Sequence, residues 1–461
     1  MENIKENKMG TQAIPKLLFS VSVPIIISMI VQALYNVVDS IFVAQFDSHA
    51  GTGALAIAFP IQNLLLSVSI GLSIGVNALL SRYLGQKNFD KADKTAGQGF
   101  FLMLCGYLLF VIIGFFFIKP YVALQASAEG DELLFQYSVE YLFIVCLGSI
   151  GVFVQIVCER LLQATGKSFY SMITQLTGAV INIILDPILI FGYFGLPAMG
   201  IVGAAVATVI GQIVAAVVGV ILNLTINREI RITIKNMIPD LHYLKEILII
   251  GIPAVMMQAI GSVMTFAMNV ILKAFSQTAM NVFSVYFKLQ SFVFMPVFGL
   301  NSGMVPIVAF NYGAKHTDRI FKVVRLALFT AVGYMLLGFL TFQLFPDLLL
   351  SFFNADAEML DIGRIALRRI SLSFVFAGIS VISISVCQAL GKSIYSMFVS
   401  IGRQLVVLIP AAYLLSLTGN LSLVWFSFPI AELMSLALCI YFLLRVIKHA
   451  FGDTKEVLLD D

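Results

Sequence analysis

QATGKSFYSM (residues 163–172) recurs as QALGKSIYSM (residues 388–397), with eight of ten positions identical. LGQKNFD (84–90) and YGAKHTD (312–318) form a second pair, which shares Gly, Lys and Asp at an offset of 228 residues. Chance rarely produces two such matches at nearly the same spacing. The chain therefore predicts an internal duplication, in which each repeat is one structural unit.

The duplication divides the chain into two halves. Pro24 and Pro253 correspond near the starts of the two repeats, so the duplication runs through each half. We expect a first unit at residues 1–227, a basic cytoplasmic linker at 228–241 and a second unit at 242–461.

The Gly-Lys-Ser of the repeat also resembles the end of a nucleotide-binding P-loop. A P-loop needs another glycine five residues before its Gly-Lys pair, but Leu161 and Val386 occupy that position. A tight turn between helices explains the glycine better, because glycine tolerates positive φ. We therefore predict no nucleotide binding.

The composition is typical of a membrane protein. Hydrophobic residues make up 60% of the 461 residues and charged residues 11%, whereas soluble domains carry about 25% charged residues. Stretches of about 20 mostly apolar residues, long enough to span a bilayer, recur through the chain. They lie at 17–43, 53–81, 96–118, 134–161, 168–193, 200–224, 244–272, 279–310, 323–345, 362–389, 393–416 and 421–446. These twelve spans predict an all-α integral membrane protein. Its two six-helix bundles should be related by a pseudo-two-fold axis along the membrane normal.

Lysine and arginine in short loops indicate the orientation, because such loops stay on the cytoplasmic side. Basic residues precede span 1 and follow spans 2, 6, 8 and 12, whereas the loops at 45–53, 126–132 and 354–361 are neutral or acidic. We expect a multi-pass protein of the cell membrane with both termini in the cytoplasm.

Other functional classes find little support. The net charge is only +3 and the basic residues are dispersed, which argues against a nucleic-acid partner. The four histidines are far apart in the sequence, and the five cysteines lie in apolar stretches without a pair spaced for metal binding. We predict no metal site apart from a possible Na⁺, no cofactor and no enzymatic activity.

Polar residues form stripes along two of the spans. The stripe in span 1 consists of Ser28, Gln32, Asn36 and Asp39, with Tyr35 beside it. The stripe in span 5 consists of Thr174, Gly178, Asn182 and Asp186. This spacing places each set on one helical face. Ionisable groups inside a span are costly unless they face a partner or a water-filled cavity, so the stripes predict a polar cavity.

Asp39 and Asp186 lie about four to seven residues from the outer ends of their spans, and so at a similar depth. Pro187 follows Asp186 and cannot donate to the carbonyl of Ile183, which should kink the helix and free that oxygen. Two close carboxylates in a cavity of low dielectric do not both ionise at low cost. We predict that the two acids share a coupling ion, either H⁺ or Na⁺. The simpler interpretation of Asp39 is a bond to a neighbouring helix.

A third stripe lies nearer the cytoplasmic end of span 4 and contains Gln155, Glu159 and Gln163. Glu159 is a further candidate for ion coupling; alternatively, it pairs with Arg160 or Lys167. We expect Gln155 to line the substrate cavity together with Gln32, Tyr35 and Asn36.

The second half does not repeat the acidic pair. It carries cations in or near its spans, namely Lys288, Arg368, Arg369 and Arg403, with Glu432 as an available counter-charge. Ion pairing or extension to the membrane surface is the simpler explanation for these cations. Gln258 and Lys288 are nevertheless candidates for the substrate cavity.

Several motifs together carry a family resemblance. They are Ser22-Val23-Pro24, Val38-Asp39-Ser40-Ile41, Leu84-Gly85-Gln86, Glu159 to Gly166, Asn182 to Ile188, and Phe428 to Glu432. Over essentially its whole length the sequence resembles the multidrug and toxic compound extrusion (MATE) family. The resemblance implies a V-shaped pair of six-helix bundles and antiport of cationic or amphipathic compounds against H⁺ or Na⁺.

The resemblance also implies a coupling site in the N-terminal bundle, formed by Asp39, Asn182 and Asp186 with a contribution from Glu159. The chain departs from members that have acids in spans 7 and 10, because span 7 here has Asn269. A coupling ion in the C-terminal bundle is therefore not expected.

Two alternatives remain open. A lipid-linked saccharide flippase of the same superfamily would need a cationic cavity for a pyrophosphate, which the cations of the second half would supply. Such flippases commonly have more spans, and the carboxylate stripes suit cations better. The other alternative is a passive channel. We expect a monomer in the lipid bilayer that exports small cationic or amphipathic molecules by alternating access.

Overall fold

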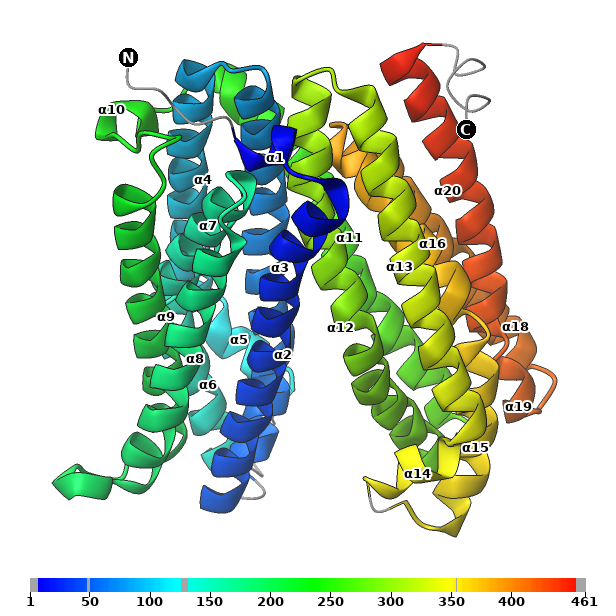
Figure 1. The fold of residues 1–461 in the computed structure, drawn as a ribbon. Helices are drawn as coiled ribbons and strands as arrows, with labels where there is room; N and C mark the ends of the chain where they lie inside the picture. The colour runs from blue at the N-terminus through cyan, green and yellow to red at the C-terminus, as the bar shows by residue number, and fades with distance from the viewer. Residues whose placement is uncertain (1–6, 48–49, 126–131, 354, 453–461) are drawn as a thin grey trace.

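The computed structural model describes residues 7–47, 50–125, 132–353 and 355–452, so parts of three predicted outer loops lie outside it. Every regular element in these ranges is a helix (Figure 1). The first half contains α1 (Lys8–Thr11), α2 (Ile14–Phe46), α3 (Ala50–Gly85), α4 (Phe89–Phe116), α5 (Ile118–Ala123), α6 (Glu132–Leu147), α7 (Ile150–Ala164), α8 (Ser168–Phe191), η1 (Tyr193–Gly195) and α9 (Gly200–Thr225). After α10 (Ile234–Met237), the second half contains α11 (Leu241–Lys273), α12 (Gln277–Gly313), α13 (Thr317–Leu344), α14 (Pro346–Ser351), α15 (Ala357–Ser371), α16 (Phe374–Ala389), α17 (Ser393–Ile401), η2 (Gly402–Leu408), α18 (Ile409–Ser416), α19 (Leu421–Val424) and α20 (Ser427–Phe451).

The twelve predicted spans are present, but two of them are bent. Within the described ranges, ten helical segments are long and apolar enough to cross a membrane, and the pairs α6–α7 and α15–α16 each form a further span bent by 46°. A serine lies at each bend. Ser149 Oγ donates to the carbonyl of Cys146 at 2.8 Å, and Ser373 Oγ donates to that of Ile370 at 2.6 Å. Such local bonds compete with the regular helical bonds.

The two halves repeat each other in backbone detail. The matched turns hold Lys87 and Lys315 at φ values of 58° and 60°, and Gly166 and Gly391 at 78° and 76°. The short helices α5 and α14 follow the third span of each half, and both halves bend in their fourth span. The fold is therefore a duplicated pair of six-helix bundles, as the sequence repeat predicted.

The bundles meet along two equivalent seams, where α3 packs on α11 and α12 packs on α2. Glycines allow this close approach. A Cβ atom at Gly75 would collide with the carbonyl oxygen of Ile247, and one at Gly303 would collide with Ser22. The positions 75 and 303 differ by 228 residues, like the motifs at 84–90 and 312–318, so the seams share the symmetry of the halves.

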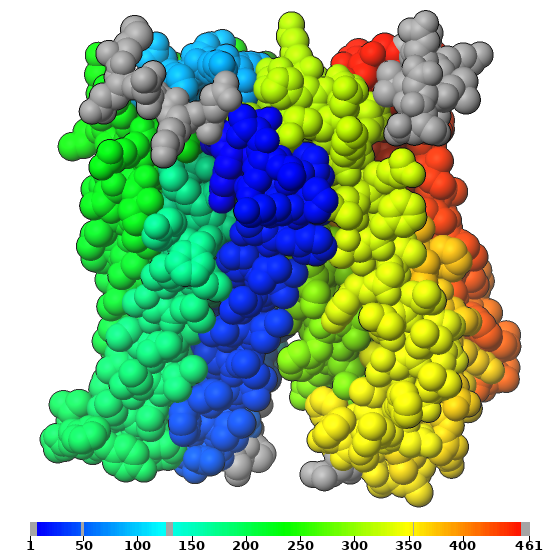
Figure 2. Space-filling view, in the orientation of Figure 1, coloured from blue at the N-terminus to red at the C-terminus, as the bar shows by residue number. Residues whose placement is uncertain are grey.

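The molecule is closed at one end and open at the other. The closed end carries α1, the last turn of α20 and the turns that join α3 to α4 and α12 to α13, and the bundles touch there (Figure 1). At the open end, which carries η1 and α14, the space-filling view shows the two bundles apart with a gap between them (Figure 2). A V-shaped pair of bundles, as the family resemblance implied, is thus present.

The short helix α1 bridges the two bundles at the closed end. On the first bundle, Asn7 Nδ2 donates to Glu229 Oε2 at 2.5 Å, and Lys167 pairs with the same carboxylate at 3.3 Å. On the second bundle, Arg319 Nη2 donates to the carbonyls of Met9 at 3.1 Å and Gln12 at 2.7 Å. Hydrogen bonds therefore join this segment to both bundles at the closed end, and we call residues 7–12 the strap.

Candidate functional site

A cavity of about 520 Å³ lies in the first bundle. Its walls come from α2, α3, α6, α7, α8 and α9, and Met295 and Ser302 of α12 border it from the second bundle. The polar stripes of the sequence face this cavity. Among the residues that line it are the candidates Gln32, Tyr35, Asn36, Asp39, Gln155, Glu159 and Asn182.

The acids of spans 1 and 5 lie close together. Asp39 lines the cavity, and Asp186 is fully buried behind Asn182. The Asn182 amide donates to Asp186 Oδ1 at 3.3 Å and to Thr208 Oγ1 at 3.3 Å. Asp39 and Asn182 line the same cavity, and Asn182 contacts Asp186, so both carboxylates lie in one region, as their similar depth predicted. Helix α8 continues without a break past Pro187, where the sequence predicts a kink.

Three buried oxygens in this region lack a hydrogen-bond partner among the described residues: Asp39 Oδ1, Asn182 Oδ1 and Asp186 Oδ2. A buried acceptor without a partner is costly. Oxygen ligands of this kind suit a hard cation, and a proton on one carboxylate would also satisfy them. The region is therefore chemically suited to take up H⁺ or Na⁺.

Glu159 lies at the other end of a hydrogen-bonded chain. Gln155 Nε2 donates to Glu159 Oε1 at 2.9 Å and to Gln175 Oε1 at 3.0 Å. Gln175 Nε2 donates in turn to Gln32 Oε1, and Gln32 Nε2 donates to the Tyr35 hydroxyl at 2.8 Å. Lys167 binds Glu229 instead of Glu159, whereas Arg160 interacts with Glu159 through its charge and donates to Gln163 at 2.8 Å.

Four residues around the acids were not singled out by the sequence. Gln175 belongs to the hydrogen-bonded chain that leads from Glu159 to Tyr35, and Thr208 accepts from Asn182. Gln62 Nε2 donates to the Tyr141 hydroxyl at 3.0 Å, and Tyr141 interacts with the charges of Asp39 and Asp186. An amide inside a span was the one available signal for Gln62 and Gln175. Tyr141 and Thr208 carried none, because isolated hydroxyls are common in spans.

Comparisons with known proteins agree with this arrangement. The MatE family model matches residues 24–188 and 253–414. This chain belongs to the MatE family. Multidrug export protein MepA of Staphylococcus haemolyticus is 27% identical over 433 residues, covering 93% of this chain and 94% of that protein.

Solved structures of transporters share the fold. One, described as the outward-facing conformation of a multidrug resistance MATE family transporter, has a TM-score of 0.88 at 22% identity and covers 98% of this chain and 99% of its own. A transporter from Pyrococcus furiosus, described as having a binding pocket of reverse polarity, has a TM-score of 0.85 at 21% identity and covers 96% and 98%. At such identities the likeness shows the fold alone.

In this MatE protein, the cations of the second bundle each have a local contact. Arg403 Nη1 pairs with Glu432 Oε1 at 2.8 Å, and Arg368 Nε donates to the carbonyl of Gln343 at 3.2 Å. The Arg369 guanidinium stacks 4.7 Å from the Phe426 ring centre and donates to the Ser422 carbonyl, and Lys288 Nζ lies 5.9 Å from the Phe353 ring centre. Both Gln258 and Lys288 are exposed and lie outside the residues that line the cavity.

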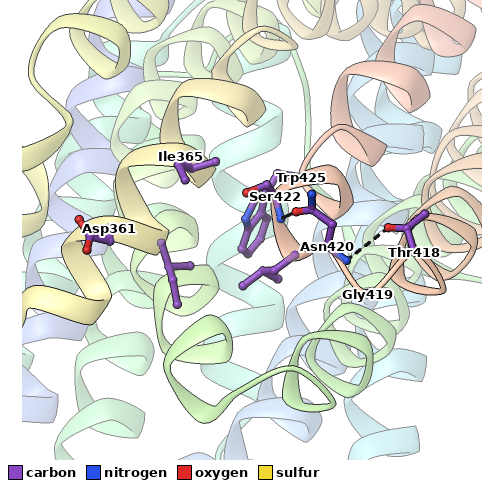
Figure 3. A pocket seen from close by; sticks show the side chains of 9 residues that line it. Asp361, Ile365, Thr418, Gly419, Asn420, Ser422 and Trp425 are labelled. Atoms are coloured by element: carbon purple, nitrogen blue, oxygen red, sulfur yellow. Dashed lines mark hydrogen bonds between the residues drawn. The ribbon is translucent and has the colours of Figure 1, made fainter.

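A second cavity lies in the second bundle, between α15 and the segment that joins α18 to α19 (Figure 3). Its volume is about 450 Å³, and its lining includes Asp361, Asn420 and Trp425. Asn420 Oδ1 accepts from the backbone N–H of Ser422 at 3.0 Å, and the backbone N–H of Asn420 donates to Thr418 Oγ1 at 3.3 Å. Those polar groups already have partners, and Asp361 is exposed, so the acidic cavity of the first bundle is the better site.

Proposed function

We propose that this protein exports cationic or amphipathic small molecules in exchange for H⁺ or Na⁺, by alternating access between its two bundles. The observation that carries the proposal is the cavity of the first bundle, which combines two acids that line it with a third, buried acid behind Asn182. The relative MepA, whose name describes a multidrug export protein, supports the same function.

The size and lining of the cavity suit such substrates. Pockets for drug-sized ligands have volumes of roughly 300–1,000 Å³, and this one is about 520 Å³. Tyr35 and Phe59 offer aromatic faces, which attract cations when the charge is removed from water. Asp39 and Glu159 supply negative charge, and the glutamines supply hydrogen bonds that many different ligands can use.

Orientation follows from the loop charges. Basic residues cluster at the closed end, at the turns before α4 and α13, which favours a cytoplasmic location for that end. The open end then faces outward, and the described conformation is the one that releases substrate and accepts the coupling ion. Transport requires the seams at Gly75 and Gly303 to part and the open end to close.

The lipid-linked flippase is disfavoured by the second bundle. Its Arg403 is neutralised by Glu432, and its other cations bind separate local partners instead of converging on one cavity. A pyrophosphate would need several of these cations together. A passive channel remains as an outcome of the transport experiment.

The test uses purified protein in liposomes loaded with ethidium, with pH and Na⁺ gradients imposed separately. We expect one of the two gradients to drive ethidium against its own concentration gradient, and liposomes without protein to show no such movement. Ethidium that only equilibrates would indicate a channel. Failure of both gradients together with flipping of a lipid pyrophosphate would establish the flippase.

A further inference from the structure

The three glutamines between Glu159 and Tyr35 form a continuous chain that crosses three helices. We call Gln155 of α7, Gln175 of α8 and Gln32 of α2 the amide chain. Each member donates its Nε2 to the next oxygen in the direction of Tyr35. At the other end, the second hydrogen of Gln155 Nε2 is donated to Glu159.

An amide has a donor end and an acceptor end, so the orientation of one amide fixes that of its neighbour. An ionised Glu159 only accepts, and it therefore holds Gln155 with its nitrogen toward the carboxylate. The other amides must follow in the observed order. The chain ends with the Tyr35 oxygen as an acceptor from Gln32, which leaves the Tyr35 hydrogen available for another group.

The acid that follows Tyr35 by one helical turn on α2 is Asp39, whose Oδ1 is buried and accepts no hydrogen bond in the described conformation. Residues four apart on a helix are neighbours, and Tyr35 interacts with the charges of Asp39, Asp186 and Glu159. A neutral Glu159 can donate, so every link can reverse. Tyr35 would then donate to Gln32, and the dipole of its O–H group, which acts on the charge of Asp39, would change direction.

We propose that the amide chain is a relay, through which the charge on Glu159 sets the direction of the Tyr35 hydroxyl and hence the ion affinity of the Asp39–Asp186 pair. The chain acts by positioning one hydrogen, and linked hydrogen bonds polarise one another in the same sense. The inference rests on the proposed function and adds a connection between two acids at different depths. Arg160 and Cys158, on the same helix as Glu159, are the other ionisable groups that interact with it.

The structure supplies a matched control. Tyr141 also interacts with Asp39, and it also accepts a hydrogen bond from a glutamine, Gln62. This pair resembles the last link of the amide chain, but no described hydrogen bond joins it to Glu159. Substitutions at Gln62 and Tyr141 therefore remove similar groups near the same acid without interrupting the relay.

The experiment measures ethidium binding to the purified protein in lipid nanodiscs while the concentration of H⁺ or Na⁺ is varied. In each background, the half-saturating ion concentration is measured for the protein with Glu159 and for the same protein with Glu159→Gln. The ratio of these two concentrations reports the effect of Glu159. We expect a ratio that differs from one by about threefold or more in the wild-type background, as for groups in one hydrogen-bond network. The same ratio should persist in the Gln62→Met and Tyr141→Phe backgrounds.

In the Gln175→Met background the ratio should fall close to one, because the chain is cut at its centre. Tyr35→Phe removes only the terminal hydroxyl and should have the same effect, which guards against a folding defect in the first variant. An equal ratio in all backgrounds would show that Glu159 acts directly through space, and would overturn the relay while gradient-driven export stands. If ethidium binding in the wild type depends on neither ion, the proposed coupling fails and the relay fails with it.

Discussion

Among single residues, Asp186 has the most demanding environment in the candidate site. Its carboxylate is fully buried, one oxygen accepts from Asn182, and the other has no partner among the described residues. An ion bound between Asp186 and Asp39 would satisfy these oxygens. Under the proposed function, the charge of the pair is what changes during the transport cycle.

We predict that Asp186→Asn reduces gradient-driven ethidium transport to the level of empty liposomes while the protein stays folded and inserted. The amide keeps the shape of the side chain but cannot change charge. Asp39→Asn should behave likewise, and the double variant should be no worse than either single one, because both substitutions destroy one shared site. Asp361→Asn is the control, since this exposed acid lies outside the site. Full transport by the double variant would exclude the N-terminal bundle from coupling.

The individual residues of the site were predictable to different degrees. Helical periodicity identified Asp39, Asn182 and Asp186, because an acid or amide on a polar stripe inside a span is rarely accidental. Periodicity says nothing about which stripes face each other. The amide chain depends on contacts among three helices, so Gln175 could not be recognised as its centre from the sequence.

At the scale of helices, the glycine seams decide how closely the bundles can approach. We predict that Gly75→Ala destabilises the folded protein by about 1–3 kcal/mol, as overpacked sites do, because the added methyl group would collide with the carbonyl of Ile247. Reversible unfolding in mixed micelles would measure the loss. Gly333→Ala on α13 is the control, since nothing lies within 4 Å of a Cβ atom there. Equal stability of the two variants would mean that the seam adapts easily.

The strap is held on the second bundle by Arg319. Arg319 donates to two carbonyls of the strap segment, and hydrogen bonds from charged groups contribute roughly 1.5–3 kcal/mol each. Arg319→Met should therefore raise the labelling rate of a cysteine placed at the buried Met9 by about tenfold or more. Lys322→Met, an exposed position on the same helix, should leave the rate unchanged. An unchanged rate in Arg319→Met would show that other contacts hold α1.

The positions of the spans were predictable, whereas their internal bends were not. Hydropathy located all twelve spans because each must bury about 20 apolar residues in lipid. Ser149 and Ser373 make local hydroxyl bonds at the bends, but serine also occurs in many spans that stay straight. The strap could not be predicted from the sequence either, because a helix of four residues is too short to show a periodic pattern.

At the scale of the whole molecule, the repeat predicted two similar bundles but not which end would be open. Alternating-access states of one chain differ by only a few kcal/mol. The sequence must be compatible with both states, so it cannot favour one end strongly. Under the proposed alternating access, the same glycines that permit close packing at the closed end must also allow the bundles to separate there.

The final prediction concerns the orientation of the molecule in the membrane. Ala198, in the exposed segment between α8 and α9, lies at the open end, whereas His316 lies in the exposed turn before α13 at the closed end. In a cysteine-free background, Ala198→Cys should react with an impermeant maleimide added to intact cells. His316→Cys should react only after the membrane is opened.

The expected labelling depends on loop charge alone, because basic loops resist transfer across the membrane. Asp39 and Asp186 lie near the open-end termini of α2 and α8, so the same labelling decides which side supplies the coupling ion. The opposite pattern, with only His316→Cys labelled from outside, would place the open end in the cytoplasm. The described conformation would then load substrate instead of releasing it, and the proposed direction of export would have to be reversed.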